Sequence, residues 1–135
     1  MKGFHYFIIV IVVCFTSCRD NSTSPSVYDN NNSPVTTNVT NSFTYTVNAN
    51  QYSDSSQNIL SFVSDSLVVT LTSSNYVSGQ AIVSVRDSLN APIFTDTVTS
   101  NTTTTIAHLK TTTPRYCNIV ISSMTAKLVF VLAGE

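Results

Sequence analysis

The residues of this sequence that could do chemistry are few and far apart. Catalysis by paired carboxylates needs two acids held together, but Asp54, Asp65, Asp87 and Asp96 each lie in or beside a predicted turn or strand end. An aspartate in a turn usually accepts hydrogen bonds from its own backbone. These acids therefore predict turns rather than a catalytic pair.

The other candidates for metal binding or nucleophilic catalysis are His108 and Cys117. One histidine without a second cannot form a typical zinc or copper site, and it leaves no Ser-His-acid triad at a defensible spacing. Cys117 lies in the apolar run 116–121, which predicts a buried small hydrophobe. We expect a protein that is not an enzyme and has no metal or cofactor. Calcium held by the loop aspartates is a weaker alternative, because no run of alternating acids with a glycine is present.

Binding residues are the remaining possibility. Glycan-binding sites use exposed aromatic rings, and Tyr52 and Tyr76 lie in polar surroundings where their rings could be accessible. The threonine-rich stretch 102–109 favours an exposed edge strand, in which Thr102 and Thr104 could contact a partner. These four residues are the predicted binding positions.

Three short segments share the order acid, hydroxyl residue, apolar residue. They begin at Asp65, Asp87 and Asp96. This order resembles the acceptor motif for O-glycosylation of exported proteins in Bacteroidota-type bacteria. The resemblance implies that Ser66, Ser88 or Thr97 carries a glycan, although so loose a pattern also arises by chance in a chain rich in serine and threonine.

The first 17 residues predict an export signal. Lys2 provides a positive start, and an almost unbroken apolar run follows from Phe4 to Phe15. A membrane-spanning helix needs about 20 apolar residues, so this run is too short to be a permanent anchor. An uncleaved anchor nevertheless remains the alternative.

The end of this segment, Phe15-Thr16-Ser17-Cys18, resembles the lipobox of bacterial lipoproteins, although Phe15 replaces the usual leucine. The resemblance implies cleavage before Cys18 and attachment of lipid to its sulfur. It also implies a location in the bacterial cell envelope, lipid-anchored to the outer membrane, either facing the periplasm or exposed at the surface.

Residues 18–42 predict a flexible tether, because Ser, Thr and Asn dominate and few apolar residues are available to offset the cost of ordering. An extra edge strand over residues 35–40 is the alternative. The whole chain carries a net charge of −1. It therefore offers no basic surface for nucleic acid.

Residues 43–135 predict one all-β domain, because β-branched and aromatic residues alternate with polar ones between turn signals. We expect a two-sheet antiparallel β-sandwich of about seven or eight strands, generically similar to immunoglobulin-like domains; a small barrel is the alternative. The runs that predict strands span residues 43–47, 59–63, 67–71, 81–85, 93–98, 102–109, 116–121 and 126–132.

Together these features predict a membrane-anchored module that binds a protein or glycan, or acts as an accessory subunit. Two alternatives are a periplasmic hydrolase or metal-handling protein, and a structural component that self-assembles through its edge strands.

Overall fold

The computed structural model describes residues 31–110 and 112–135, apart from the side chains of residues 108 and 110. The predicted export signal and Cys18 lie outside the described residues. Every regular element in the described part is a β-strand, which confirms the all-β class, and no helix there could cross a membrane. The strands are β1 (Val35–Val39), β2 (Ser42–Ile59), β3 (Ser66–Asp87), β4 (Pro92–Val98), β5 (Thr102–Lys110) and β6 (Pro114–Gly134).

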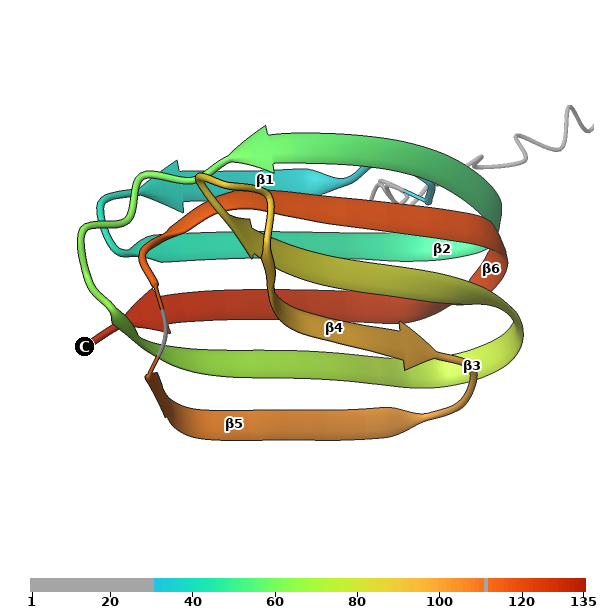
Figure 1. Ribbon diagram of the computed structural model, residues 1–135. Helices are drawn as coiled ribbons and strands as arrows, with labels where there is room; N and C mark the ends of the chain where they lie inside the picture. The colour runs from blue at the N-terminus through green and yellow to red at the C-terminus, as the bar shows by residue number, and fades with distance from the viewer. Residues whose placement is uncertain (1–30, 111) are drawn as a thin grey trace, which may run out of the picture.

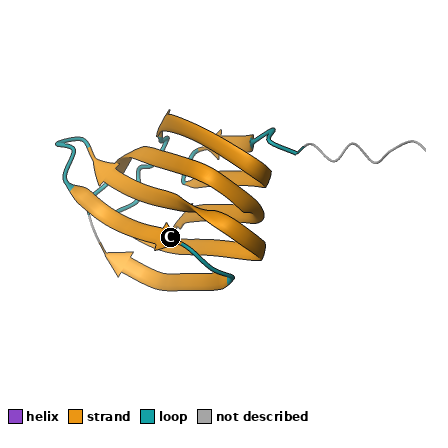
Figure 2. Ribbon diagram, turned by 90° about the vertical axis from the view of Figure 1, so that its right-hand side faces the viewer, coloured by secondary structure: helices purple, strands orange, loops and turns teal. Residues whose placement is uncertain are grey.

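The described strands form one antiparallel sheet in the order β1-β2-β6-β3-β4, with β5 also paired to β3. Strands β2, β3 and β6 are long and bend near their middles, so the sheet folds over on itself (Figure 1, Figure 2). Half-sheet A consists of β1, β5 and residues 42–49, 66–74 and 126–134. Half-sheet B consists of β4 and residues 52–59, 78–87 and 114–122.

Backbone irregularities produce the bends. The pairing of β6 with β2 shifts register between Ala49 and Asp54, and its pairing with β3 shifts between Ser74 and Gln80. Such bulges bend a strand and increase its twist. Each long strand also contains residues with a left-handed backbone conformation at its bend. These are Gln51 in β2 (φ 49°), Asn75 and Gly79 in β3 (φ 55° and 85°) and Ser123 in β6 (φ 45°).

Side-chain hydroxyls satisfy the backbone groups that lose their ladder partners at the bends. The Gln51 N–H donates to Thr125 Oγ1 at 2.9 Å, and the Ser123 N–H donates to Ser53 Oγ at 2.8 Å. Strands β2 and β6 therefore support each other's bends reciprocally. This exchange lets the ladder resume on the far side of each bulge.

The sequence predicts seven or eight strands in two sheets, whereas residues 31–110 and 112–135 form six strands in one sheet because three of the strands are long. The runs at 67–71 and 81–85 both belong to β3, and those at 116–121 and 126–132 both belong to β6. The Ser- and Asn-rich stretch 73–79 predicts a loop between the two runs of β3. It instead continues the β-structure of β3, as does the stretch between the two runs of β6, where the Ser123 N–H donates to Ser53 Oγ.

Two further predictions are wrong, namely a strand at 59–63 and the tight hairpin that Ser64-Asp65-Ser66 predicts between this run and 67–71. Strand β2 ends at Ile59, and residues 60–65 form a connection from half-sheet B to half-sheet A. Asn41 holds this connection, because its Oδ1 accepts the N–H groups of Val63 at 2.8 Å and Ser64 at 3.2 Å. The apolar signal of this run arises because Leu60 and Phe62 are buried in the core.

The inward-facing side chains of both half-sheets form a single hydrophobic core. Phe130 of half-sheet A is fully buried and makes an edge contact with Phe43, with ring centroids 6.3 Å apart. Across the two layers, Phe94 of β4 stacks on Phe130 at a centroid distance of 6.1 Å. This aromatic contact joins the two halves of the folded sheet.

The structured region begins earlier than residue 43. The alternative strand at the end of the predicted tether is present as β1, which pairs with β2 in continuous register from Val35↔Thr46 to Val39↔Ser42. All five residues of β1 are exposed, so little apolar burial accompanies its formation. Backbone pairing holds β1, and Asn38 Nδ2 adds a hydrogen bond to the Ile59 carbonyl at 2.7 Å.

Candidate functional site

The predicted chemical candidates do not converge. No group of three or more His, Cys, Asp or Glu residues comes together in the described part of the chain. Cys117 is fully buried, and burial raises the pKa of its thiol to about 12. The thiol is therefore protonated at neutral pH and is a poor nucleophile. His108 belongs to β5, and its side chain lies outside the described part.

Asp87 is used structurally, as its place in the sequence predicts. Its Oδ1 accepts the N–H groups of Leu89 at 2.9 Å and Ala91 at 2.8 Å, and its Oδ2 accepts the Thr112 hydroxyl at 3.1 Å. These hydrogen bonds lower the pKa of the Asp87 carboxyl below its usual value, and the bond from the Ala91 N–H has the largest effect. The carboxylate closes the turn between β3 and β4.

The two predicted tyrosines lie at the bends, and both pack partly against the core. Tyr76 donates its hydroxyl to the Gly79 carbonyl at 2.8 Å, and its backbone N–H donates to Asn101 Oδ1 at 2.9 Å. Tyr52 pairs with Met124 on β6, and burial followed by the neighbouring Asp54 raises its pKa. The two rings therefore support the bends and do not form an open aromatic platform.

The predicted threonines lie on the inner side of edge strand β5. Thr102 and Thr104 are half-buried, and Thr104 donates to Asp96 Oδ2 of β4 at 3.2 Å. The exposed threonines of this strand are Thr103 and Thr105. A partner that contacts β5 would therefore meet Thr103 and Thr105, and not the predicted Thr102 and Thr104.

The three possible glycosylation positions differ in accessibility. Ser66 is half-buried, and its hydroxyl donates to Glu135 Oε2 at 3.1 Å. Ser88 lies in the exposed turn after β3, and Thr97 is exposed on β4. Glycosylation stays a prediction, for which Ser88 and Thr97 are the accessible positions.

Three polar side chains of β2 have buried atoms without a hydrogen-bond partner among the described residues. Ser56 Oγ, Asn58 Nδ2 and the Tyr45 hydroxyl are buried without a hydrogen-bond partner in the described part of the protein. Burial, and then the neighbouring Tyr52, Asp54 and Cys117, raise the pKa of Tyr45.

Because an unpaired buried hydroxyl is costly, we expect Tyr45→Phe to raise the free energy of unfolding by about 1 kcal/mol. The matched control is Tyr76→Phe, which removes the bonded hydroxyl of Tyr76 and should lower the free energy of unfolding by about 1 kcal/mol. Urea denaturation measures both. If Tyr45→Phe lowers stability as Tyr76→Phe does, the Tyr45 hydroxyl has a hydrogen-bond partner in solution.

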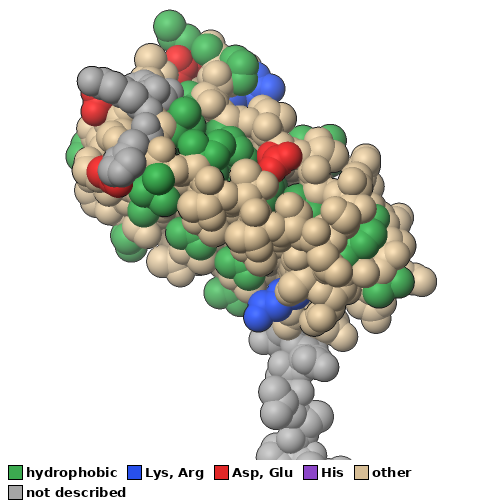
Figure 3. Space-filling view, turned by 90° about the horizontal axis from the view of Figure 1, so that it is seen from below, with side chains coloured by type: hydrophobic (Ala, Val, Ile, Leu, Met, Phe, Trp, Pro, Cys, Tyr) green, Lys and Arg blue, Asp and Glu red, His purple; other side chains and the backbone are tan. Residues whose placement is uncertain are grey.

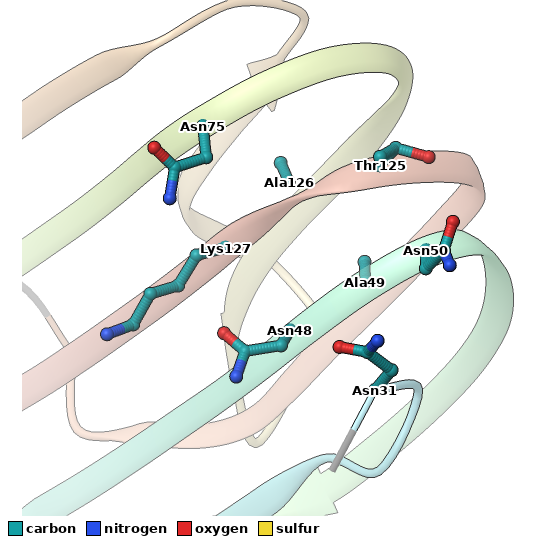
Figure 4. Close-up of a pocket in the computed structure, with 8 residues that line it drawn as sticks. All are labelled: Asn31, Asn48, Ala49, Asn50, Asn75, Thr125, Ala126 and Lys127. Carbon is teal, nitrogen blue, oxygen red and sulfur yellow. The ribbon is translucent and has the colours of Figure 1, made fainter. Parts of the chain in front are cut away.

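A polar cleft lies at the bend, on the side of half-sheet A (Figure 4). It has a volume of about 340 Å³. Four of its eight described lining residues are asparagines, from β2, β3 and the segment before β1, and β6 adds a threonine, an alanine and a lysine. The lining residues are Asn31, Asn48, Ala49, Asn50, Asn75, Thr125, Ala126 and Lys127.

Hydrogen bonds fix one wall of this cleft, which we call the asparagine cleft. Asn32 donates its backbone N–H to the Asn48 carbonyl at 2.8 Å and its Nδ2 to the Asn50 carbonyl at 3.0 Å. The Asn50 N–H in turn donates to Asn32 Oδ1 at 2.7 Å. Asn31 is thereby held against β2, while the side chains of Asn48 and Asn75 make no hydrogen bond to any other described residue.

A regular uncharged surface adjoins the cleft on the outer face of half-sheet A. Cross-strand pairing places threonine and valine side chains in two parallel rows that run from β5 to β1. We call this surface the threonine–valine face. Its rows are Thr105-Thr70-Val131-Thr44-Thr37 and Thr103-Thr72-Val129-Thr46-Val35.

The next row toward the bend is Ser74-Lys127-Asn48, which leads into the asparagine cleft. None of the seven threonine hydroxyls on the threonine–valine face bonds to another group in the described structure. The view from the β5 side shows mostly uncharged side chains, with charged ones at isolated points (Figure 3). The face therefore offers hydroxyls and methyl groups to a partner, and the cleft offers amides together with the ammonium group of Lys127.

No known protein family, curated protein or solved structure matches this chain. What it binds therefore has to follow from its own geometry. Sequence reasoning did not identify the asparagine cleft, because its residues are scattered from Asn31 to Lys127. The feature of the sequence that comes closest to indicating the cleft is the pair Asn48 and Asn50, which flank one small residue just before a bend.

Proposed function

We propose that this protein is a non-enzymatic binding module of the bacterial cell envelope, anchored by lipid on Cys18, whose asparagine cleft binds a neutral glycan. The single observation that carries the glycan assignment is the set of free amide side chains in the cleft. An amide both donates and accepts hydrogen bonds, so it complements sugar hydroxyls, which do the same. The lipobox resemblance and the polar residues after Cys18 support the anchor.

The size of the cleft suits a short glycan segment. Its volume of about 340 Å³ lies at the lower end of the range for small-molecule sites. None of its described lining residues is aromatic, so hydrogen bonds supply most of the affinity and we expect weak binding. The threonine–valine face can support a longer chain that leaves the cleft, because its hydroxyls bond to no other group among the described residues.

We also propose that half-sheets A and B together correspond to an immunoglobulin-like β-sandwich, although the long strands are shared between the layers. This would place the cleft at one end of the sandwich, a position at which loops and bends of such domains bind ligands. A protein partner on the threonine–valine face is the second possibility, favoured by the absence of charge in its two rows.

Titration of the full chain with neutral oligosaccharides of glucose, mannose and N-acetylglucosamine tests this function, with NMR chemical shifts as the readout. We expect shifts at the amides of residues 48–50 and 125–127. Asn48→Ala and Asn75→Gly should each weaken binding by about threefold to tenfold, because each removes one hydrogen bond. Glycine is chosen at residue 75 because it tolerates the φ of 55° found there.

Gln57→Ala is the matched control, because Gln57 is an exposed amide on the outer face of half-sheet B. It should leave binding unchanged. Shifts that do not involve the cleft, or equal losses in Gln57→Ala and Asn48→Ala, would contradict the assignment of the cleft. If none of the oligosaccharides causes shifts, the glycan proposal fails.

A further inference from the structure

Strand β1 is an edge strand without the usual protection against pairing. Proteins block exposed edges with charged residues, prolines and bulges. Edge strand β4 begins at Pro92 and contains Asp96, and the pairing of β5 with β3 shifts register between Leu67 and Val69. Strand β1 has the sequence VTTNV and contains neither charge nor proline, and its pairing with β2 has no register shift.

The exposed valines of β1 add apolar surface to this edge. Val35 is 61% exposed and Val39 is 55% exposed. Each pairs with an outward-facing residue of β2, Val35 with Thr46 and Val39 with Ser42, so both valines lie on the outer face of half-sheet A. In the described part of the protein, β2 is the only strand that pairs with β1.

The sequence of β1 is nearly the same in both directions, and this identifies the partner. If two copies pair antiparallel about Thr37, Val35 lies opposite Val39 of the second copy and Thr37 lies opposite its own equivalent. Thr36 then lies opposite the second copy's Asn38. Pairs of β-branched residues stabilise neighbouring strands, and no like charges oppose each other. One strand thus provides both halves of a self-complementary two-fold contact.

We propose that β1 pairs antiparallel with β1 of a second copy of this chain, with the two-fold axis at Thr37. The two half-sheets A then form one continuous sheet. The row Thr105-Thr70-Val131-Thr44-Thr37 continues into its symmetry equivalent, so both threonine–valine faces lie on the same side. This inference does not depend on the proposed glycan site.

The contact is small, so the dimer should depend on concentration. Five residues per copy bury far less than the roughly 800 Å² per partner that is typical of stable complexes. Weak pairing of this kind becomes effective when both partners are confined, because confinement raises their effective concentration. Attachment to one membrane through Cys18, as proposed above, would provide such confinement.

Disulfide trapping of the full chain in detergent solution tests the register. Residues directly opposite in an antiparallel pair have Cα atoms about 4.5–5.5 Å apart, which is within disulfide range. Under mild oxidation, Thr37→Cys should form several-fold more disulfide-linked dimer than Thr103→Cys, which is also an exposed position on an edge strand, or the unsubstituted chain. Val35→Cys and Val39→Cys should trap little dimer alone and much more when mixed.

If Thr37→Cys traps no more dimer than Thr103→Cys, the proposal is overturned. If Val35→Cys alone traps as much as Thr37→Cys, the proposed register is wrong. Sedimentation provides a second measurement that needs no added cysteine. The unsubstituted chain and Thr103→Lys should associate as concentration rises, whereas Thr37→Lys should stay monomeric because it places two positive charges opposite each other. An unsubstituted chain that stays monomeric throughout also overturns the proposal, whatever its glycan binding.

Discussion

Replacing Gly79 by alanine is expected to lower the free energy of unfolding by at least about 3 kcal/mol. Gly79 has a φ of 85°, a conformation that costs energy for any residue with a Cβ. A Cβ here would also collide with the Ser123 carbonyl oxygen and lie 2.5 Å from Met124 Cα. The obstacle is backbone of β6, so a side-chain rotation cannot relieve it.

Chemical denaturation of Gly79→Ala and Ser78→Ala side by side measures this effect. Ser78 is exposed and adjoins Gly79 at the same bend, so its substitution should change stability by less than about 1 kcal/mol. Equal stability of the two variants would mean that β3 and β6 do not approach as closely at the bend as described. A Gly79→Ala chain that does not fold agrees with the expected direction.

Replacing Phe130 by alanine is the second large effect, with an expected loss of about 3–5 kcal/mol. Phe130 is fully buried and contacts the rings of Phe43 and Phe94, from β2 and β4. Truncation would leave a cavity where the two half-sheets meet. Because Phe94 belongs to the opposite layer, the loss also weakens the contact that holds the folded sheet closed.

The control for Phe130→Ala is Val131→Ala, because Val131 follows on the same strand but points to the outer face and is only half-buried. We expect this control to lose about 1 kcal/mol or less. Thermal unfolding followed by circular dichroism compares the two. A loss at Phe130 no larger than that at Val131 would contradict the described packing between the half-sheets.

The strands could be predicted from the sequence because burial follows a period of two. Phe43, Tyr45 and Val47 alternate with polar residues, and all three are buried in β2 as this pattern indicates. The same pattern does not show that a polar stretch continues a strand. Residues 73–79 are typical of a loop in sequence, but they remain β-structure because the neighbouring strand β6 bends with them.

The bends could not be predicted with the same ease. Asn75 and Gly79 are residue types that adopt positive φ readily, but Gln51 and Ser123 are not. The latter two are held in this conformation by hydroxyls from residues more than 60 positions away in the chain. Local sequence preference carries no information about contacts of that range.

The asparagine cleft was missed for the same reason. Asn48, Asn75 and Lys127 meet only because three bends coincide. The sequence predicts Tyr52 and Tyr76 to be exposed aromatic residues. In the structure, the Tyr76 hydroxyl donates a hydrogen bond to the Gly79 carbonyl within the bend. Exposure of a single aromatic residue depends on its neighbours across the sheet, which the linear pattern does not reveal.

The central position of β6 also determines when the protein can fold. Strands β2 and β3 do not pair with each other in the described structure; each pairs with β6 along both half-sheets. Strand β6 follows all of these partners along the chain, and the pair Ser42↔Ala133 joins residues far apart in sequence. Such distant pairing makes folding slow. A chain emerging from a ribosome would therefore have two separate, incomplete pieces of sheet until β6 has been synthesised.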